Sequence, residues 1–131
     1  EKGLMGHSDA DVLCHAISDA LLGAAGLGDI GQHFPDTDPI YFGASSIMLL
    51  QCCAEKALQK GYAVGNVDAV VIAQEPKIGP HTEHMAYHIA QALGVDPAQV
   101  NIKATTTEYM GFTGRKEGIA AQAVCLLERI G

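Results

Sequence analysis

A helical pattern of apolar residues begins behind two good N-cap residues near the start of the chain. Ser8 and Asp9 can each cap a helix, and apolar positions then recur until Gly26 and Gly28, which predicts a helix over residues 9–27. One stripe of this helix presents a carboxylate, an imidazole and a carboxylate at i, i+4 and i+8: Asp11, His15 and Asp19. Taken alone, the stripe is more typical of a solvated flank with an ordinary histidine than of a ligand site.

A long loop and two further helices follow. Residues 29–43 mix Gly, Pro, Asp and Thr without periodicity, which predicts a long loop, and such a loop in a small domain is often functional. A second helix is predicted over residues 45–60, with a serine cap and an apolar side suited to cover a sheet. A third is predicted over residues 80–94, from a proline to a glycine.

The remaining apolar segments predict strands. The continuous apolar run within residues 67–73 is typical of a strand buried on both faces, and residues 100–104 form a second strand. Residues 119–127 allow either structure, because their alanine content suits a helix while their alternation suits a strand. No repeat or interdomain linker interrupts the pattern, so residues 1–131 are predicted to form one domain.

Charge and composition argue against several classes of partner. The 131 residues carry 15 acidic and 8 basic side chains, and the net charge of −7 without any basic run argues against nucleic acid and against an anionic membrane surface. Aromatic residues make up only 5% and tryptophan is absent, which argues against a groove that stacks bases. No apolar run approaches the roughly 20 residues of a membrane span.

The four cysteines show no C-x-x-C spacing, and two of them are adjacent within a predicted helix, where neighbouring side chains diverge. These residues are Cys14, Cys52, Cys53 and Cys125. We therefore expect free thiols in a reducing compartment.

A run of threonines directly follows the second predicted strand. Thr105, Thr106 and Thr107 offer hydroxyl and backbone N–H groups to phosphate oxygens at a strand end, where α/β folds commonly bind ligands. The next residue, Glu108, would repel a diphosphate unless a divalent cation bridged them, so it implies Mg²⁺ or Mn²⁺. The alternative is a strand end rich in β-branched residues followed by a solvated glutamate.

Three motifs occur in this order along the chain: His7-Ser8-Asp9-x-Asp11, Asp29-Ile30-Gly31 with Phe34-Pro35-Asp36-Thr37-Asp38-Pro39, and Thr105-Thr106-Thr107-Glu108-x-x-Gly111-Phe112-Thr113-Gly114-Arg115-x-Glu117-Gly118. Together they closely resemble the motifs of the 2-C-methyl-D-erythritol 2,4-cyclodiphosphate synthase family, and the resemblance extends over the whole chain. The resemblance implies an α/β (α+β) fold with a small mixed β-sheet covered on one face by helices. It also implies a strand at residues 119–127, and a chorismate-mutase-like homotrimer with active sites between subunits.

The reaction implied by the resemblance is a lyase-type intramolecular phosphoryl transfer. The 2-phosphate of 4-diphosphocytidyl-2-C-methyl-D-erythritol 2-phosphate attacks the β-phosphate and expels CMP, which yields the 2,4-cyclodiphosphate of the non-mevalonate isoprenoid pathway. By the same resemblance, His7 and Ser8 contact the erythritol phosphate, and His7 and Thr106 assist the transition state. Asp29, Ile30 and Gly31 take the erythritol hydroxyls, and a mobile loop closes over that end and excludes water: Phe34, Pro35, Asp36, Thr37 and Asp38.

The resemblance also implies a cytidine pocket and a central cavity. The pocket residues would be Ala73, Gln74, Glu75, Pro76, Lys77, Ile78, Gly79 and Ala104, with Thr105 to Glu108 on the phosphates. Gly79 replaces a larger apolar residue of the family pattern, so the base contact there would rest on the backbone. Phe112, Arg115 and Glu117 would line the cavity at the trimer axis, where a prenyl diphosphate can sit; otherwise Arg115 and Glu117 would be a weak surface ion pair.

The implied metal sites involve His15 and Glu108. In the family, His15 binds the first metal, usually Zn²⁺, together with the Asp and His of an Asp-x-His motif on an N-terminal strand, and Glu108 holds the second metal between the phosphates. No Asp-x-His occurs in this sequence. Because a catalytic zinc needs three protein ligands, we expect that the N-terminal strand is missing from this chain rather than that the function is lost.

A second group of histidines includes a pair with the spacing of metal ligands. His81, His84 and His88 fall within the third predicted helix, and the last two have the i, i+4 spacing of helical metal ligands. The family has no metal there, and Met85 and Ile89 carry the buried face, which favours ordinary surface histidines.

Two other functions remain open from the sequence. One is a metal-dependent phosphohydrolase that uses His15 and Glu108 with water as the nucleophile. The other is a non-catalytic trimer that binds prenyl diphosphate through Arg115 and Phe112. The expected location is the cytoplasm of a bacterium or the stroma of a plastid.

Overall fold

The computed structural model describes residues 2–34, 45–73, 81–106 and 120–130. Within these ranges it contains four helices, one 3₁₀ turn and three strands. In chain order they are α1 (Lys2–Ala24), α2 (Ile30–His33), α3 (Ser45–Gln59), β1 (Tyr62–Ala73), α4 (Thr82–Leu93), η3 (Pro97–Gln99), β2 (Val100–Thr106) and β3 (Ala120–Arg129).

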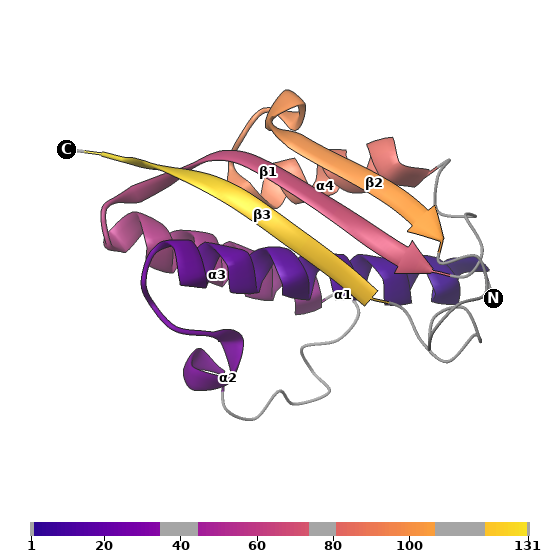
Figure 1. Ribbon diagram of the computed structural model, residues 1–131, viewed down its shortest axis with the longest axis horizontal. Coiled ribbons are helices and arrows are strands. Elements are labelled where there is room, and N and C mark those ends of the chain that lie inside the picture. Colours follow the sequence, from indigo (N-terminus) through magenta and orange to yellow (C-terminus); the bar gives the residue numbers. More distant parts are fainter. Residues whose placement is uncertain (1, 35–44, 74–80, 107–119, 131) are drawn as a thin grey trace.

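The strands form a three-stranded mixed sheet in the order β2-β1-β3. The central strand β1 pairs in parallel with β2, from Val67 opposite Val100 to Ala73 opposite Thr106, and it pairs antiparallel with β3. The long helices α1, α3 and α4 all lie on one side of the sheet (Figure 1). The predicted fold class is therefore confirmed, and so is the strand that the pattern alone left ambiguous.

The core lies between this helical layer and the sheet. Leu13, Ile17 and Leu21 of α1 are completely buried, together with Leu50 of α3 and Val71 of β1. Fully burying such a side chain stabilises the fold by about 1.5–3 kcal/mol relative to leaving it exposed. Because α1, α3 and β1 all contribute to one cluster, the helical layer holds α1 firmly against the strands.

Two buried thiols occupy the contact between α1 and α3. Burial raises the pKa of Cys14 to about 11, even though a hydrogen bond with Ser46 lowers it, and burial likewise raises the pKa of Cys53 to about 11. All four cysteines are free, as expected. The two buried thiols act as small apolar residues that let the helices pack closely.

The structure corrects the expectation that β1 is buried on both faces. Val67, Ala69 and Val71 point into the core, whereas Asp68 between them is exposed. The apolar run extends over both faces, but among the described residues the helices cover only one of them. The strand also begins earlier than predicted, at Tyr62.

The other face of the sheet is partly apolar. Val124 and Leu126 of β3 are 69% and 67% exposed on this face. Beside them, the Asp68 carboxylate accepts hydrogen bonds from the side chains of Asn101 and Lys103, each at 3.0 Å, which hold its pKa below the usual value. We call this the outer face of the sheet.

Two boundaries near the predicted site also differ from the sequence prediction. Helix α1 begins at Lys2, so His7 and Ser8 lie inside the helix and not at its mouth. Gly3 and Gly6 each destabilise a helix by about 1 kcal/mol, but this cost does not prevent one from forming. The predicted N-terminus of the helix was therefore wrong, because it relied on the glycines and on Ser8 as a cap. The predicted loop over residues 29–43 also contains the short helix α2.

Candidate active site

An open hollow of about 580 Å³ lies where α1, α2 and the start of β3 meet. Its lining residues are Val12, His15, Ala16, Asp19, Asp29, Ile30, Gly31 and Ala121. A second hollow of about 420 Å³ shares Ala16, Asp19 and Ala121 and follows β3. The structure thus brings together the predicted metal ligand His15 and the predicted hydroxyl-binding segment Asp29–Gly31, which are separated by fourteen residues or more in the sequence.

His15 is half-buried and has a defined orientation. Its Nδ1 lies 2.9 Å from the backbone oxygen of Asp11. Because a carbonyl oxygen can only accept, Nδ1 carries the proton and the lone pair of the neutral ring is on Nε2. A hydrogen bond of this kind, from one ring nitrogen to a backbone carbonyl, is the usual way in which a metal-binding histidine is oriented.

The segment after α1 is fixed by two carboxylates. Asp29 is the N-cap of α2, and its Oδ1 accepts a hydrogen bond from the backbone N–H of Gln32 at 3.0 Å. Asp19 Oδ1 accepts from the backbone N–H of Ile30 at 3.1 Å, and the Ile30 side chain is buried. The Asp19 contact ties residues 29–31 to α1, one helical turn beyond His15, and the Asp29 contact caps α2.

Asp19 is a site residue whose role the sequence reasoning missed. The i, i+8 spacing from Asp11 placed it on the same stripe as His15, but nothing in the sequence indicated a partner eleven residues away. His33 was missed as well: its Nε2–H donates to the backbone oxygen of Leu27 at 2.7 Å and closes the turn between α1 and α2.

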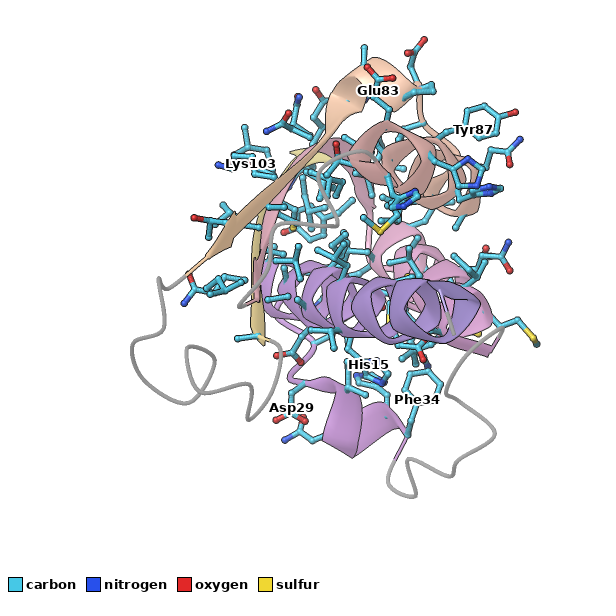
Figure 2. The ribbon with its side chains drawn as sticks, turned by 90° about the vertical axis from the view of Figure 1, so that its right-hand side faces the viewer. His15, Asp29, Phe34, Glu83, Tyr87 and Lys103 are labelled. Atoms are coloured by element: carbon cyan, nitrogen blue, oxygen red, sulfur yellow. The ribbon has the colours of Figure 1, made fainter. Side chains whose placement is uncertain are left out.

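Phe34, the first residue of the predicted closing loop, is half-buried at the end of α2, and its backbone N–H donates to Ile30 oxygen at 2.7 Å. Figure 2 shows His15, Asp29 and Phe34 on the same side of the molecule. The other predicted loop residues lie outside the described part of the chain: Pro35, Asp36, Thr37 and Asp38.

The second group of predicted site residues, those for the nucleotide and its phosphates, begins at the ends of two adjacent strands. Ala73 and Thr106 are register partners at the carboxyl ends of the parallel strands β1 and β2, and Thr105 beside them is exposed. Ala104 is half-buried on the helical side. The rest of this group lies outside the described residues: Gln74, Glu75, Pro76, Lys77, Ile78, Gly79, Thr107, Glu108, Phe112, Arg115 and Glu117.

The sheet separates these two groups of residues. The hollow borders Ala121 of β3, whereas Thr105 and Thr106 belong to β2, and the order β2-β1-β3 places these strands at opposite edges of the described sheet. Neighbouring strands are about 4.8 Å apart, so the two edge strands are about 10 Å apart. Within the described residues, His15 and the threonines therefore do not line a common hollow.

A model of the YgbB family matches residues 1–128 of the chain. The chain belongs to this family. A 2-C-methyl-D-erythritol 2,4-cyclodiphosphate synthase from Geotalea uraniireducens is 63% identical over 129 residues, which are 98% of this chain and 82% of the relative. The synthase of the same name from Thiobacillus denitrificans is 62% identical over 98% of this chain and 81% of that relative.

Solved structures of YgbB proteins have the same fold. The bifunctional IspDF from Campylobacter jejuni superposes with a TM-score of 0.86 at 46% identity, over 95% of this chain and 34% of that chain. This chain therefore spans about a third of the bifunctional protein. An IspF from Plasmodium falciparum in complex with CDP superposes with a TM-score of 0.79 at 34% identity, over 92% and 72% of the two chains.

YgbB enzymes are in general metal-dependent, and His15 is the predicted metal ligand that lies within the described residues. His15 fits a ligand role because its ring is oriented by a backbone carbonyl. The ranges that the structure describes contain no group of three histidine, cysteine or acidic side chains that could hold an ion. One histidine cannot form the three-ligand open site of a catalytic zinc.

No helix in the described part of the chain is both long and apolar enough to cross a membrane. The location in a bacterial cytoplasm or a plastid stroma stays a prediction.

Proposed function

We propose that the chain converts 4-diphosphocytidyl-2-C-methyl-D-erythritol 2-phosphate to the 2,4-cyclodiphosphate by intramolecular phosphoryl transfer. Membership of the YgbB family gives it cyclodiphosphate synthase activity in the non-mevalonate isoprenoid pathway. An oxygen of the 2-phosphate bonds to the β-phosphorus, the bond from that phosphorus to the bridging oxygen breaks, and CMP leaves with that oxygen. No covalent enzyme intermediate is needed, because positioning and charge stabilisation supply most of the rate.

The observation that carries this proposal is the shared hollow of His15 and residues 29–31. Asp29, Ile30 and Gly31 bind the erythritol hydroxyls in our proposal, and the two carboxylate contacts that fix this segment would limit its movement when substrate binds. His7 and Ser8 belong to the same helix as His15, and they contact the erythritol phosphate. His7 and Thr106 assist the transition state.

The nucleotide would bind at the carboxyl ends of β1 and β2. The pairing of Ala73 with Thr106 supports this assignment, because it makes the predicted cytidine segment (residues 73–79) and the predicted phosphate segment (residues 105–108) leave the sheet side by side. The complex of the Plasmodium falciparum relative with CDP is consistent with a cytidine nucleotide.

The active unit would be a homotrimer with sites between subunits. Two observations support it: the two groups of site residues belong to opposite edges of the sheet, and the outer face exposes the apolar residues Val124 and Leu126. A neighbouring copy could cover this face and bring its β2 edge to the hollow. Phe112 and Arg115 would then line a central cavity suited to a prenyl diphosphate.

Two divalent cations would complete the site, Zn²⁺ or a similar ion at His15 and Mg²⁺ or Mn²⁺ at Glu108. When bound, such ions neutralise and align phosphate oxygens. His15 Nε2 would be one ligand atom, held in place by the Asp11 carbonyl. A triply phosphorylated substrate on a chain of net charge −7 needs this added positive charge.

Product analysis by ³¹P NMR tests the proposal against its two alternatives. The purified chain, supplied with substrate and divalent cations, should release CMP and the cyclic diphosphate. A hydrolysed monophosphate in place of the cyclic product would indicate the phosphohydrolase. Prenyl diphosphate binding without turnover would indicate the non-catalytic trimer.

A further inference from the structure

Helix α4 presents two imidazoles to solvent on its exposed face. His84 and His88 lie one turn apart, both are exposed, and their Nε2 atoms are 3.1 Å from one another. Their ring centroids are 4.4 Å apart, and the rings are nearly perpendicular. In Figure 2, α4 with its labelled residues Glu83 and Tyr87 lies at the opposite end of the molecule from His15 and Asp29.

The separation of the two nitrogens matches that of two ligands on one metal ion. Imidazole nitrogens bind zinc at about 2.0–2.1 Å, so two of them are about 2.9 Å apart at a right angle and about 3.3 Å apart at the tetrahedral angle. The observed 3.1 Å lies between these limits. Spacing of four residues alone does not ensure such convergence, because side chains on a helix can also point apart.

The surroundings of the pair would keep it near this geometry. The opposite face of α4 is anchored by buried Ile89, Ala90 and Leu93, so an ion could bind without disturbing the core. The Tyr87 ring packs edge-on against His88 at 5.5 Å, and its hydroxyl accepts a hydrogen bond from Gln91 at 3.1 Å. These contacts restrict the movement of His88, which lowers the entropy lost when a ligand binds.

We propose that His84 and His88 form a two-point chelate for a borderline divalent transition ion, of which Zn²⁺ and Ni²⁺ are examples. Imidazole nitrogen suits these ions, whereas Mg²⁺ and Ca²⁺ prefer oxygen ligands. Water completes the coordination, because both side chains are exposed. The pair lies at the opposite end of the molecule from the proposed metal ligand His15, and Ni²⁺ binding by the pair can be measured without the cyclisation reaction.

Titration of the purified chain with Ni²⁺ alone tests this assignment, with isothermal calorimetry for affinity and NMR for location. His84→Ala and His88→Ala should each lower the affinity for one equivalent of Ni²⁺ by about tenfold or more, because a chelate needs both nitrogens. The paramagnetic ion should broaden the backbone amides of residues 84–88 in the wild type and not in either variant. Alanine suits both exposed helical positions, so the variants should fold normally.

His81→Ala is the matched control, since it removes an exposed histidine next to the same helix. It should leave the Ni²⁺ affinity unchanged, and formation of the cyclic product should be unchanged in all three variants. Equal Ni²⁺ affinity in the wild type and in His84→Ala would overturn the proposal and leave only a hydrogen bond between two imidazoles. If His81→Ala lost as much Ni²⁺ affinity as His84→Ala, the assignment of the ion to His84 and His88 alone would be overturned.

Discussion

At the β3 edge of the sheet, polar side chains are held by hydrogen bonds within the chain, whereas at the β2 edge they stand exposed at a strand end. His15 and Asp19 each bond to a backbone group, and the segment at Asp29 is capped and anchored. Thr105 is exposed beside the last residue of β2. The first edge is thus preorganised by its own chain, whereas at the second edge the exposed Thr105 side chain is open to solvent.

This difference supports the proposal that each edge contributes one of the two groups of active-site residues. The site proposed above would need both groups of residues, yet the sheet order keeps them apart in one chain. The outer face, with Val124 and Leu126 exposed, offers an apolar surface through which a second copy could supply the missing half. The predictions below separate the contributions of the two edges.

The largest expected effect concerns Glu108, two residues after the end of β2 in the sequence. Glu108→Gln removes the anionic ligand proposed for the second metal, so kcat should fall at least about 100-fold while the fold is kept. Activity is measured over a series of Mg²⁺ and Mn²⁺ concentrations, with circular dichroism for the fold. Glu128→Gln is the control, because it makes the same charge change on the exposed end of β3. Unaltered metal dependence in Glu108→Gln would contradict the assignment.

The next largest effect tests whether residues of the two edges act together in one site. His7→Ala and Thr106→Ala should each be nearly inactive, yet coexpressed chains should recover a detectable fraction of wild-type turnover. Recovery is expected because some interfaces of a mixed trimer pair an intact His7 with an intact Thr106.

Differently tagged chains allow the mixed trimers to be isolated before the assay. Mixtures of each variant with itself, carried through the same purification, are the controls. Verified mixed trimers without activity above the parents would show that both residues serve a site within one chain.

A smaller effect concerns the preorganisation of the β3 edge. Asp19→Ala removes the acceptor for the Ile30 N–H, so residues 29–31 should lose their fixed position and kcat/KM should fall about tenfold. Asp19→Asn retains Oδ1 as an acceptor and should keep most of the activity. Glu83→Ala, an equal loss of charge on α4, should have no effect. If Asp19→Asn is as impaired as Asp19→Ala, the charge matters and the backbone contact does not.

The smallest expected effect is on stability in alkali, away from both edges. Cys14 and Cys53 have a pKa of about 11 in the folded chain, against 9.0 for an unperturbed thiol. From pH 9 to pH 11 the unfolded chain loses these protons while the folded chain keeps them, so stability falls with rising pH over that window. Thermal unfolding should show a shallower fall in Tm for Cys14→Ala than for the wild type.

Cys52→Ser is the matched control for that measurement, because Cys52 is exposed and adjacent to Cys53. Its Tm should decrease with pH as steeply as in the wild type. If Tm decreased with pH as steeply in Cys14→Ala as in the wild type, the buried Cys14 thiol would not contribute to the loss of stability in alkali.

The sequence by itself determined the long helices, the approximate positions of β1 and β2, and the family. Apolar periodicity located α3 and α4 closely, and the resemblance of the motifs named His15 and residues 29–31, which share the hollow. These features depend on local propensity and on the order of residue types, which a single sequence contains. Boundaries were less certain, since Ser8 capping a helix and Ser8 inside one are both locally acceptable.

Only the tertiary structure decided which groups meet. Residues 120–129 alternate in a way that suits a strand and contain alanines that suit a helix, and antiparallel pairing with β1 selects the strand. The contact of Asp19 with Ile30 and the convergence of His84 and His88 depend on side-chain positions in the packed chain. The physical reason is the same in each case: these interactions join groups whose distance is set by packing and long-range hydrogen bonds, which no local pattern specifies.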